Sequence, residues 1–202
     1  MRLDDLLRNF FDVQHMYTLL PELLHGLRVT VEIAALSLAG GLLLGLLLAL
    51  VRAGLRTRGC PAWLRWSEVL IVIYVDVARA LPPLVTLVVV YFALPYLGVF
   101  VLVLGAFAEE GFRAGIEALD RGQMEAARAL GLTFLQGMMH VVAPQAVKIA
   151  IPELTGRMVS ITKDVSLASV IGVSDLLRVA KLDIARSGNY SSLIAAAILF
   201  TL

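Results

Sequence analysis

Long apolar segments separated by short charged ones run through the whole chain. The clearest is residues 29–51, whose only charged residue is Glu32; as a helix it is long enough to cross a hydrocarbon core of about 30 Å. Further apolar segments lie at about 69–94, at 141–167 and from Ser191 onward. This pattern predicts an all-α polytopic membrane protein with about five core transmembrane helices, built as one domain over residues 1–202.

The second apolar segment, 69–94, contains polar residues and a predicted break. Pro82 and Pro83 are adjacent, so carbonyls one turn earlier lack helical donors and must face protein or a wet cavity. Asp76 and Arg79 are three residues apart and are candidates for an ion pair on one helix face. The sequence predicts a kinked span here.

The segment predicted as the third span has too few apolar residues to cross a membrane. Residues 96–108 supply only about a dozen apolar positions, whereas a span needs about 20. We therefore expect that residues are missing between Phe100 and Val101. The last apolar segment stops at Leu202 in mid-span, so we also expect chain beyond that residue.

Composition supports a membrane protein. Hydrophobic residues make up 59% of the chain, charged residues 16%, and the mean hydropathy is +0.87, which excludes an ordinary soluble domain. A net charge of +1 argues against a nucleic-acid-binding protein, which needs a concentrated basic face. The single cysteine, Cys60, permits no internal disulfide.

The arginines that follow the first apolar segment predict the topology. Arg52, Arg56, Arg58 and Arg65 lie in one short loop, which the positive-inside rule places in the cytoplasm. The N-terminus is then outside. Residues 1–25 become an external lead-in, 109–134 a cytoplasmic loop and 173–190 an external helix and loop.

The loop 109–134 contains a short helix with signals at both ends. Asp120 and Gln123 have capping-box spacing, and Gly131 suits the left-handed residue just past a helix end. Thr133 and Gln136 repeat the capping-box spacing for a second helix. Small side chains allow another protein to close around the first helix. The residues predicted to couple to such a partner are Gln123, Glu125, Ala126, Ala127, Arg128, Leu130 and Gly131.

Several short motifs lie along most of the chain. They include Glu125-Ala126-Ala127 followed by Gly131, and also Gly26-Leu27-Arg28-Val29-Thr30, Arg79-Ala80-Leu81-Pro82, Arg113-Ala114-Gly115-Ile116, Pro144-Gln145-Ala146, Lys163-Asp164-Val165-Ser166-Leu167 and Val170-Ile171-Gly172-Val173. Through these motifs the chain resembles the membrane subunits of binding-protein-dependent ABC importers, in the polar amino acid permease branch, and the first motif is similar to the EAA loop of that family.

The resemblance implies a type I ABC importer permease fold, in the inner membrane of a bacterium. The implied partners are two ABC ATPase subunits, a second permease copy or paralogue, and an external substrate-binding protein. ATP with Mg²⁺ would bind the ATPase subunits; the chain has no G-x-x-x-x-G-K-[ST] motif. We expect this chain to bind no cofactor or metal and not to be an enzyme.

The segment 141–167 carries the candidate substrate path. At 100° per residue, Glu153, Arg157, Ser160 and Asp164 lie within about 60° of one another. Such a stripe faces the protein interior because charges are costly in lipid. Arg157 or Lys163 would bind the carboxylate of an amino acid, and Asp164 or Glu153 its ammonium group. The alternative is structural: Glu153 and Arg157 pair, and Lys163 and Asp164 cap the helix.

The sequence therefore predicts a transmembrane subunit of an ATP-driven importer that forms the path of a polar amino acid. The alternatives are an importer for another small solute, an ATP-independent secondary transporter or channel, and a structural scaffold. Co-purification of an ATPase, and substrate-dependent ATP hydrolysis, would distinguish them.

Overall fold

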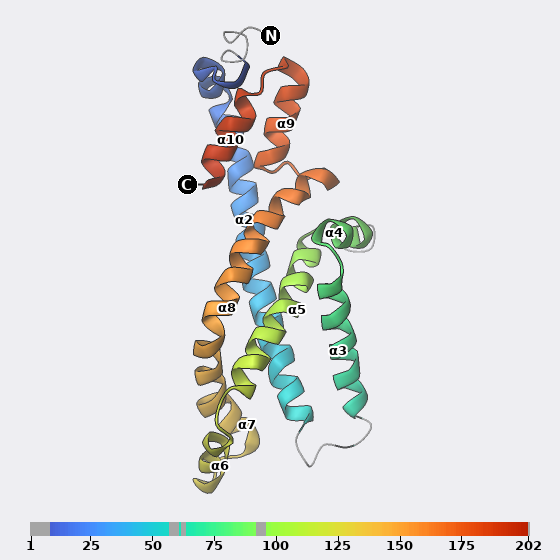
Figure 1. Ribbon diagram of the computed structural model, residues 1–202, viewed down its shortest axis with the longest axis vertical. Coiled ribbons are helices and arrows are strands. Elements are labelled where there is room, and N and C mark those ends of the chain that lie inside the picture. The colour runs from blue at the N-terminus through green and yellow to red at the C-terminus, as the bar shows by residue number, and fades with distance from the viewer. Residues whose placement is uncertain (1–8, 57–60, 62–63, 92–95, 202) are drawn as a thin grey trace. The chain divides into compact units, whose positions relative to one another are not determined.

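The computed structural model describes residues 9–56, 61, 64–91 and 96–201, and these residues form helices and connecting turns without a strand (Figure 1). The elements in chain order are α2 (Val13–Leu55), α3 (Arg65–Ala80), α4 (Pro83–Tyr91), α5 (Tyr96–Glu117), α6 (Arg121–Ala129), α7 (Phe134–Gly137), the π-helix η2 (Met138–Val142), α8 (Ala143–Asp164), the 3₁₀-helix η3 (Val165–Ile171), α9 (Leu176–Ser187) and α10 (Ser191–Thr201). The all-α prediction is confirmed.

The chain forms two compact units, and helices α2 and α8 each run from one into the other. The first unit comprises Met1–Ala35 and Thr162–Leu202, and the second comprises Leu36–Ile161. Among the described helices, only α2 is by itself long and apolar enough to cross a membrane. Arg58, Cys60 and Leu202, on which predictions were made, lie outside the described residues.

Helix α2 begins earlier than the hydrophobic pattern predicts. It starts at Val13, with Pro21 inside it, so residues 13–25 of the predicted lead-in belong to the first long helix. Leu19 and Leu23 explain this extension, because both are buried in the core of the first unit. That core is completed by Leu176, Ala180, Ala195 and Ala196.

The start of α9 is held against α2 within the first unit. The Thr30 hydroxyl donates to the Gly26 carbonyl and accepts from the Leu176 amide at 3.1 Å. A Cβ on Gly26 would lie 2.9 Å from the Leu176 Cα, so the close approach requires glycine. Gly26 and Thr30, which belong to the motif at residues 26–30, therefore position α9. The helix predicted within 173–190 is present.

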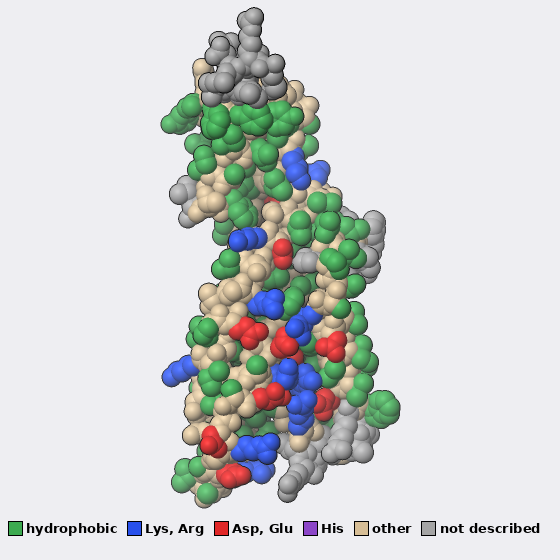
Figure 2. All heavy atoms as spheres, viewed as in Figure 1, with side chains coloured by type: hydrophobic (Ala, Val, Ile, Leu, Met, Phe, Trp, Pro, Cys, Tyr) green, Lys and Arg blue, Asp and Glu red, His purple; other side chains and the backbone are tan. Residues whose placement is uncertain are grey.

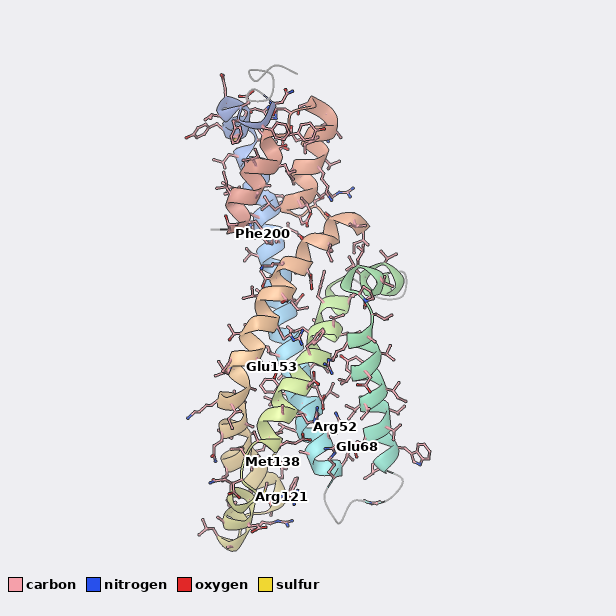
Figure 3. The ribbon with its side chains drawn as sticks, viewed as in Figure 1. Arg52, Glu68, Arg121, Met138, Glu153 and Phe200 are labelled. Carbon is pink, nitrogen blue, oxygen red and sulfur yellow. The ribbon has the colours of Figure 1, made fainter. Side chains whose placement is uncertain are left out.

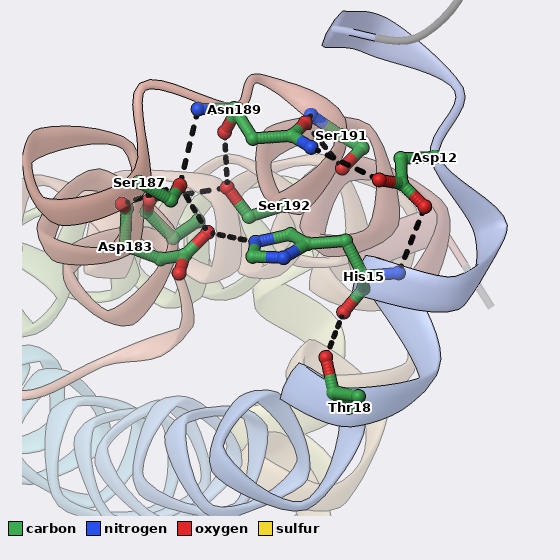
Figure 4. Close-up of polar contacts among 9 residues, drawn as sticks. Asp12, His15, Thr18, Asp183, Ser187, Asn189, Ser191 and Ser192 are labelled. Carbon is green, nitrogen blue, oxygen red and sulfur yellow. Dashed lines mark hydrogen bonds and ion pairs between the residues drawn. The ribbon is translucent and has the colours of Figure 1, made fainter.

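A polar network joins the beginning of α2 to α9 and the turn after it (Figure 4). His15 Nε2 lies 2.8 Å from Asp183 Oδ2, and the Asn189 side-chain amide donates to Asp12 at 3.4 Å. Asn189 also accepts from the amide and hydroxyl of Ser191, the first residue of α10. These bonds hold three segments of the first unit together.

The predicted break at the two prolines is present. Helix α3 ends at Ala80 and α4 begins at Pro83. The predicted pair of Asp76 with Arg79 is wrong: Asp76 is exposed, and Arg79 pairs with Glu110. The reason is that α3 packs against α5, which presents a carboxylate to Arg79.

Helix α5 is longer than the sequence pattern predicts. It is continuous across Phe100 and Val101 and runs to Glu117, which gives 22 residues, or about 33 Å. Its apolar part still ends at Ala108, so the expectation that residues are missing between Phe100 and Val101 stays a prediction. The predicted loop 109–134 is helical from its start to Glu117, since the carboxylates there are paired with arginines of neighbouring helices.

The core of the second unit is made of small and apolar residues on α2, α5 and α8, namely Ala49, Ala108, Phe112, Ala150 and Leu154. Helices approach closely in this unit. A Cβ on Gly45 of α2 would lie 2.4 Å from the Cβ of Ala108 on α5. A Cβ on Gly115 of α5 would lie 2.5 Å from the carbonyl oxygen of Ala146 on α8. Backbone contact of this kind is typical of helix packing in membranes.

Candidate coupling helix and substrate path

Helix α6 has the ends that the sequence predicts. The Asp120 side chain accepts from the Gly122 amide at 2.7 Å. At the other end Gly131 is left-handed, with φ of 84°, and the Leu132 amide donates to the Ala127 carbonyl at 3.1 Å. These bonds form a Schellman ending. The helix therefore has defined limits without support from a partner.

Gln123 does not complete the predicted capping box with Asp120. Its side-chain oxygen instead accepts from Gln145 Nε2 of α8 at 3.2 Å. The second predicted capping box, between Thr133 and Gln136, is present at the start of α7. Gln123 thus connects α6 to α8, the helix that carries the candidate substrate path.

The predicted coupling residues lie on both faces of α6. Ala127 is buried, and a Cβ on Gly137 would lie 3.4 Å from its methyl group. Leu130, just after the helix, is 83% exposed. The remaining members of the set are all exposed: Gln123, Glu125, Ala126, Arg128 and Gly131.

A network of ion pairs joins α3, α5 and the C-terminal end of α2, and acidic and basic side chains alternate on the face shown in Figure 2. Its members are Arg52, Arg56, Arg79, Arg113, Glu68, Glu109, Glu110 and Glu117.

The most buried pair in the network is Arg52 with Glu109, at 3.0 Å, in which the Glu109 side chain is 0% exposed. At the surface, the hydrogen bond from Arg56 to Glu68 raises the pKa of Arg56. The network neutralises charges that would otherwise be costly in lipid.

The candidate substrate path on α8 meets α5 at an aromatic ring. The Arg157 guanidinium lies over Phe107, 4.3 Å from the ring centroid. The Arg79 guanidinium lies 5.5 Å from the centroid of the same ring. Both distances are within the range of cation–π attraction. Phe107 is thus shared by two arginines from different helices.

The structural alternative for Glu153 and Arg157 is wrong, because these two described residues form no ion pair with each other. Arg157 contacts Phe107 instead, and Glu153 is exposed (Figure 3). Glu153 lies beside α5, since a Cβ on Gly111 would be 4.0 Å from its carboxylate carbon. An acidic and a basic group are therefore adjacent and unpaired on one face of α8.

The other stripe residues are arranged differently. Ser160 donates its hydroxyl to the Gly156 carbonyl of its own helix at 3.1 Å. Asp164 is half-buried at the end of α8 and makes no side-chain capping bond, and Lys163 is exposed. Lys163 and Asp164 belong to the first unit, whereas Glu153, Arg157 and Ser160 belong to the second.

Sequence reasoning missed Phe107 and the position of Arg79 in this site. Phe107 lies in an apolar run, and nothing in that pattern distinguishes a ring under two guanidinium groups from an ordinary core residue. Arg79 was assigned to a pair within its own helix. Only the packing of α3 and α8 against α5 brings these groups together.

Comparison with known proteins identifies the family. The model of the binding-protein-dependent transport system inner membrane component matches residues 41–202. The chain belongs to this family. The resemblance inferred from the EAA-like segment and the accompanying motifs is therefore confirmed.

Similar proteins include transporter permeases. The chain is 31% identical to a probable amino-acid ABC transporter permease protein, PatM, of Vibrio harveyi, over 94% of this chain and 88% of that protein. It is 34% identical to the arginine transport system permease protein ArtQ of Bacillus subtilis, over 90% and 85% of the two chains.

Solved structures support the fold. An amino acid ABC transporter crystallised with histidines matches with a TM-score of 0.76 and 30% identity, over 93% of this chain and 90% of that one. The inward-facing MetNI methionine transporter matches with a TM-score of 0.75 at 17% identity, over 91% and 90%, and shows the fold alone. The predicted importer permease fold is confirmed.

Proposed function

We propose that this permease forms the translocation path for a polar amino acid in an ATP-driven importer of the bacterial inner membrane. The names of similar proteins support an amino acid, since several are amino-acid, glutamine or arginine permeases. ATP hydrolysis takes place in separate ATPase subunits, and this chain binds no cofactor or metal. Its multi-pass topology has the loop after α2 in the cytoplasm.

The observation that carries the substrate proposal is the unpaired Arg157 over Phe107 with Glu153 one turn away. Contact with a ring holds the guanidinium in place without using its hydrogen-bond donors on a carboxylate of the protein. Those donors remain free to bind a substrate carboxylate in two-pronged geometry. Glu153 offers the opposite charge to the ammonium group.

Ser160 is a further candidate of this path in the second unit, and Lys163 and Asp164 are candidates in the first unit. Ser160 contributes a hydroxyl oxygen, and Asp164 and Lys163 add one charge of each sign at the end of the helix. Charges of both signs lower the cost of removing the charges of a zwitterion from water.

The ATPase subunits are proposed to bind the exposed face of α6. Ala126 and Ala129 present little bulk there, and Glu125 and Leu130 supply a charge and an apolar anchor. Movement of α6 reaches the substrate path through Gln123, which bonds Gln145 of α8. Closure of the ATPases on ATP would in this way open the path.

A second copy of the permease, or a paralogue, completes the path, and an external binding protein delivers the substrate. The described part of α2 has a row of exposed leucines, including Leu36, Leu43 and Leu47, which suit lipid or a second permease.

The test is ATP hydrolysis and uptake by the purified assembly across a panel of amino acids, with the binding protein present. Arg157→Gln and Asp164→Asn should each reduce uptake about 10- to 150-fold, the value of a charge-assisted hydrogen bond of roughly 1.5–3 kcal/mol. Thr155→Val, on the opposite face of α8, is the matched control. Normal uptake in both charge variants would contradict the substrate path; no amino acid stimulating hydrolysis would contradict the substrate class.

A further inference from the structure

A cavity of about 540 Å³ lies in the second unit between α6 and the helices that support it. It is lined by residues of α2, α5, α6, α7 and η2, and its volume is within the roughly 300–1,000 Å³ of small-molecule sites. The lining includes Arg52 of α2, Arg121 of α6 and Met138 of η2, which are labelled in Figure 3. Helix α6 contributes Arg121 and Met124 to the lining, and neither belongs to the set of predicted coupling residues.

Most of the lining is apolar. Ala49 and Ala53 of α2, Phe134 of α7, and Met138 and Val142 of η2 contribute hydrocarbon to the wall. The polar residues of the lining are all charged: Arg52, Arg56, Arg113, Glu117, Asp120 and Arg121. Such a cavity suits a molecule with a hydrocarbon body and a charged head.

One of the arginines that line the cavity has no carboxylate partner among the described residues. Four arginines line the cavity: Arg52, Arg56, Arg113 and Arg121. Of the two carboxylates there, Glu117 accepts from Arg56 and Arg113, at 2.9 and 2.8 Å, and Asp120 caps α6.

No carboxylate among the described residues pairs with Arg121, and Arg113 Nε is a buried donor without an acceptor. Arg121 is therefore unpaired at the cavity, and Arg113, although paired with Glu117 and Glu110, keeps one donor without an acceptor.

We propose that this cavity binds an anionic phospholipid, with its phosphate between Arg121 and Arg113 and hydrocarbon of an acyl chain against the apolar wall. The position supports this occupant, because the cavity lies where the long apolar helix α2 ends and the arginines begin, the level of the lipid headgroups. Free phosphate would gain nothing from the apolar wall. A bound headgroup would bridge α6 and α5, so lipid composition would tune coupling.

The experiment uses the permease assembled with its ATPase subunits in nanodiscs of phosphatidylcholine with and without phosphatidylglycerol. Native mass spectrometry then measures retained lipid. Wild type should retain phosphatidylglycerol in preference to phosphatidylcholine. Arg121→Gln should reduce that preference about fivefold, the contribution of one arginine near a membrane surface. Ala53→Phe, which fills the apolar part without changing charge, should reduce it as well.

Lys148→Gln is the matched control, because Lys148 is an exposed cation on α8 away from the cavity, and it should retain the lipid as wild type does. Equal retention in wild type, Arg121→Gln and Ala53→Phe would overturn the proposal. Displacement of the lipid by inorganic phosphate alone would also overturn it, in favour of a free-anion site. Lipid retention is measured without substrate, so this result is independent of the amino acid proposed above.

Discussion

Replacing Glu109 by leucine should strongly destabilise the permease, because it leaves Arg52 buried beside an apolar side chain. The Arg52 side chain is 12% exposed and its guanidinium lies 3.0 Å from Glu109. At an effective dielectric constant of about 20, two unit charges at that distance attract by about 5 kcal/mol, and desolvation offsets much of this. Removing one partner of a buried pair costs about 3–5 kcal/mol. The loss should be near 3 kcal/mol to the extent that the Glu68 carboxylate, 3.7 Å from Arg52, still neutralises the guanidinium.

The double variant Arg52→Met with Glu109→Leu should recover most of this loss. A buried pair replaced by apolar residues of similar volume is often neutral, and Glu68 keeps its 2.6 Å bond to Arg56. Thermal unfolding in detergent measures both effects. For a chain of this length, 3–5 kcal/mol corresponds to a midpoint about 6–20 °C lower. A single variant as stable as the double one would refute the account that the charges of α5 are neutralised by pairing.

Three further predictions concern helix ends and helix crossings. Asp175 caps α9 through the Arg178 amide, so Asp175→Ala should cost about 0.5–2 kcal/mol and Asp175→Asn much less. Burial raises the pKa of the Asp175 carboxyl, and the hydrogen bond and positive charge of Arg178 oppose that rise. Because the folded state then binds a proton more tightly than the unfolded state, the free energy of unfolding should increase as pH falls through the raised pKa. This pH dependence should vanish in Asp175→Asn. Thermal unfolding measured as a function of pH checks the loss of the cap and the pH dependence. An unchanged pH dependence in Asp175→Asn would contradict the role given to the Asp175 carboxyl. Gly45→Ala brings a Cβ within 2.4 Å of Ala108 and should lower the free energy of unfolding by about 1–3 kcal/mol or more. The control Gly156→Ala, whose Cβ would have no atom within 4 Å, should be neutral or stabilising. Equal assembly yields of the two variants would argue against the close crossing of α2 and α5. Gly131→Val and Glu125→Lys should each leave the permease inserted in the membrane but uncouple ATP hydrolysis from uptake. The control Gly188→Val also replaces a glycine at positive φ, but far along the chain from α6, and should leave coupling intact. Normal uptake with normal ATPase co-purification in the first two variants would contradict docking at α6.

Local patterns in the sequence determined the class of protein and several helix ends. Apolar run length predicts membrane helices because backbone groups must be satisfied within the helix in lipid. The break at Pro82 and Pro83, the cap at Asp120 and the left-handed Gly131 depend on neighbouring residues alone, and each is present as predicted. The EAA-like segment, together with the motifs along most of the chain, was enough to predict the family.

Tertiary structure decided what charged residues do within those helices. Glu109 and Glu110 marked the end of a span in the sequence, yet α5 continues past them because arginines from α2 and α3 neutralise both. The length of α2 likewise depends on contacts that Leu19 and Leu23 make with residues far along the chain.

The candidate site shows the same division. Periodicity placed Glu153 and Arg157 on one face of α8, because spacing along a helix is a local property. It could not show that Arg157 contacts Phe107 of α5 rather than Glu153, or that Arg79 shares the ring. Those contacts join residues distant in sequence, and the choice of partner depends on how the helices pack.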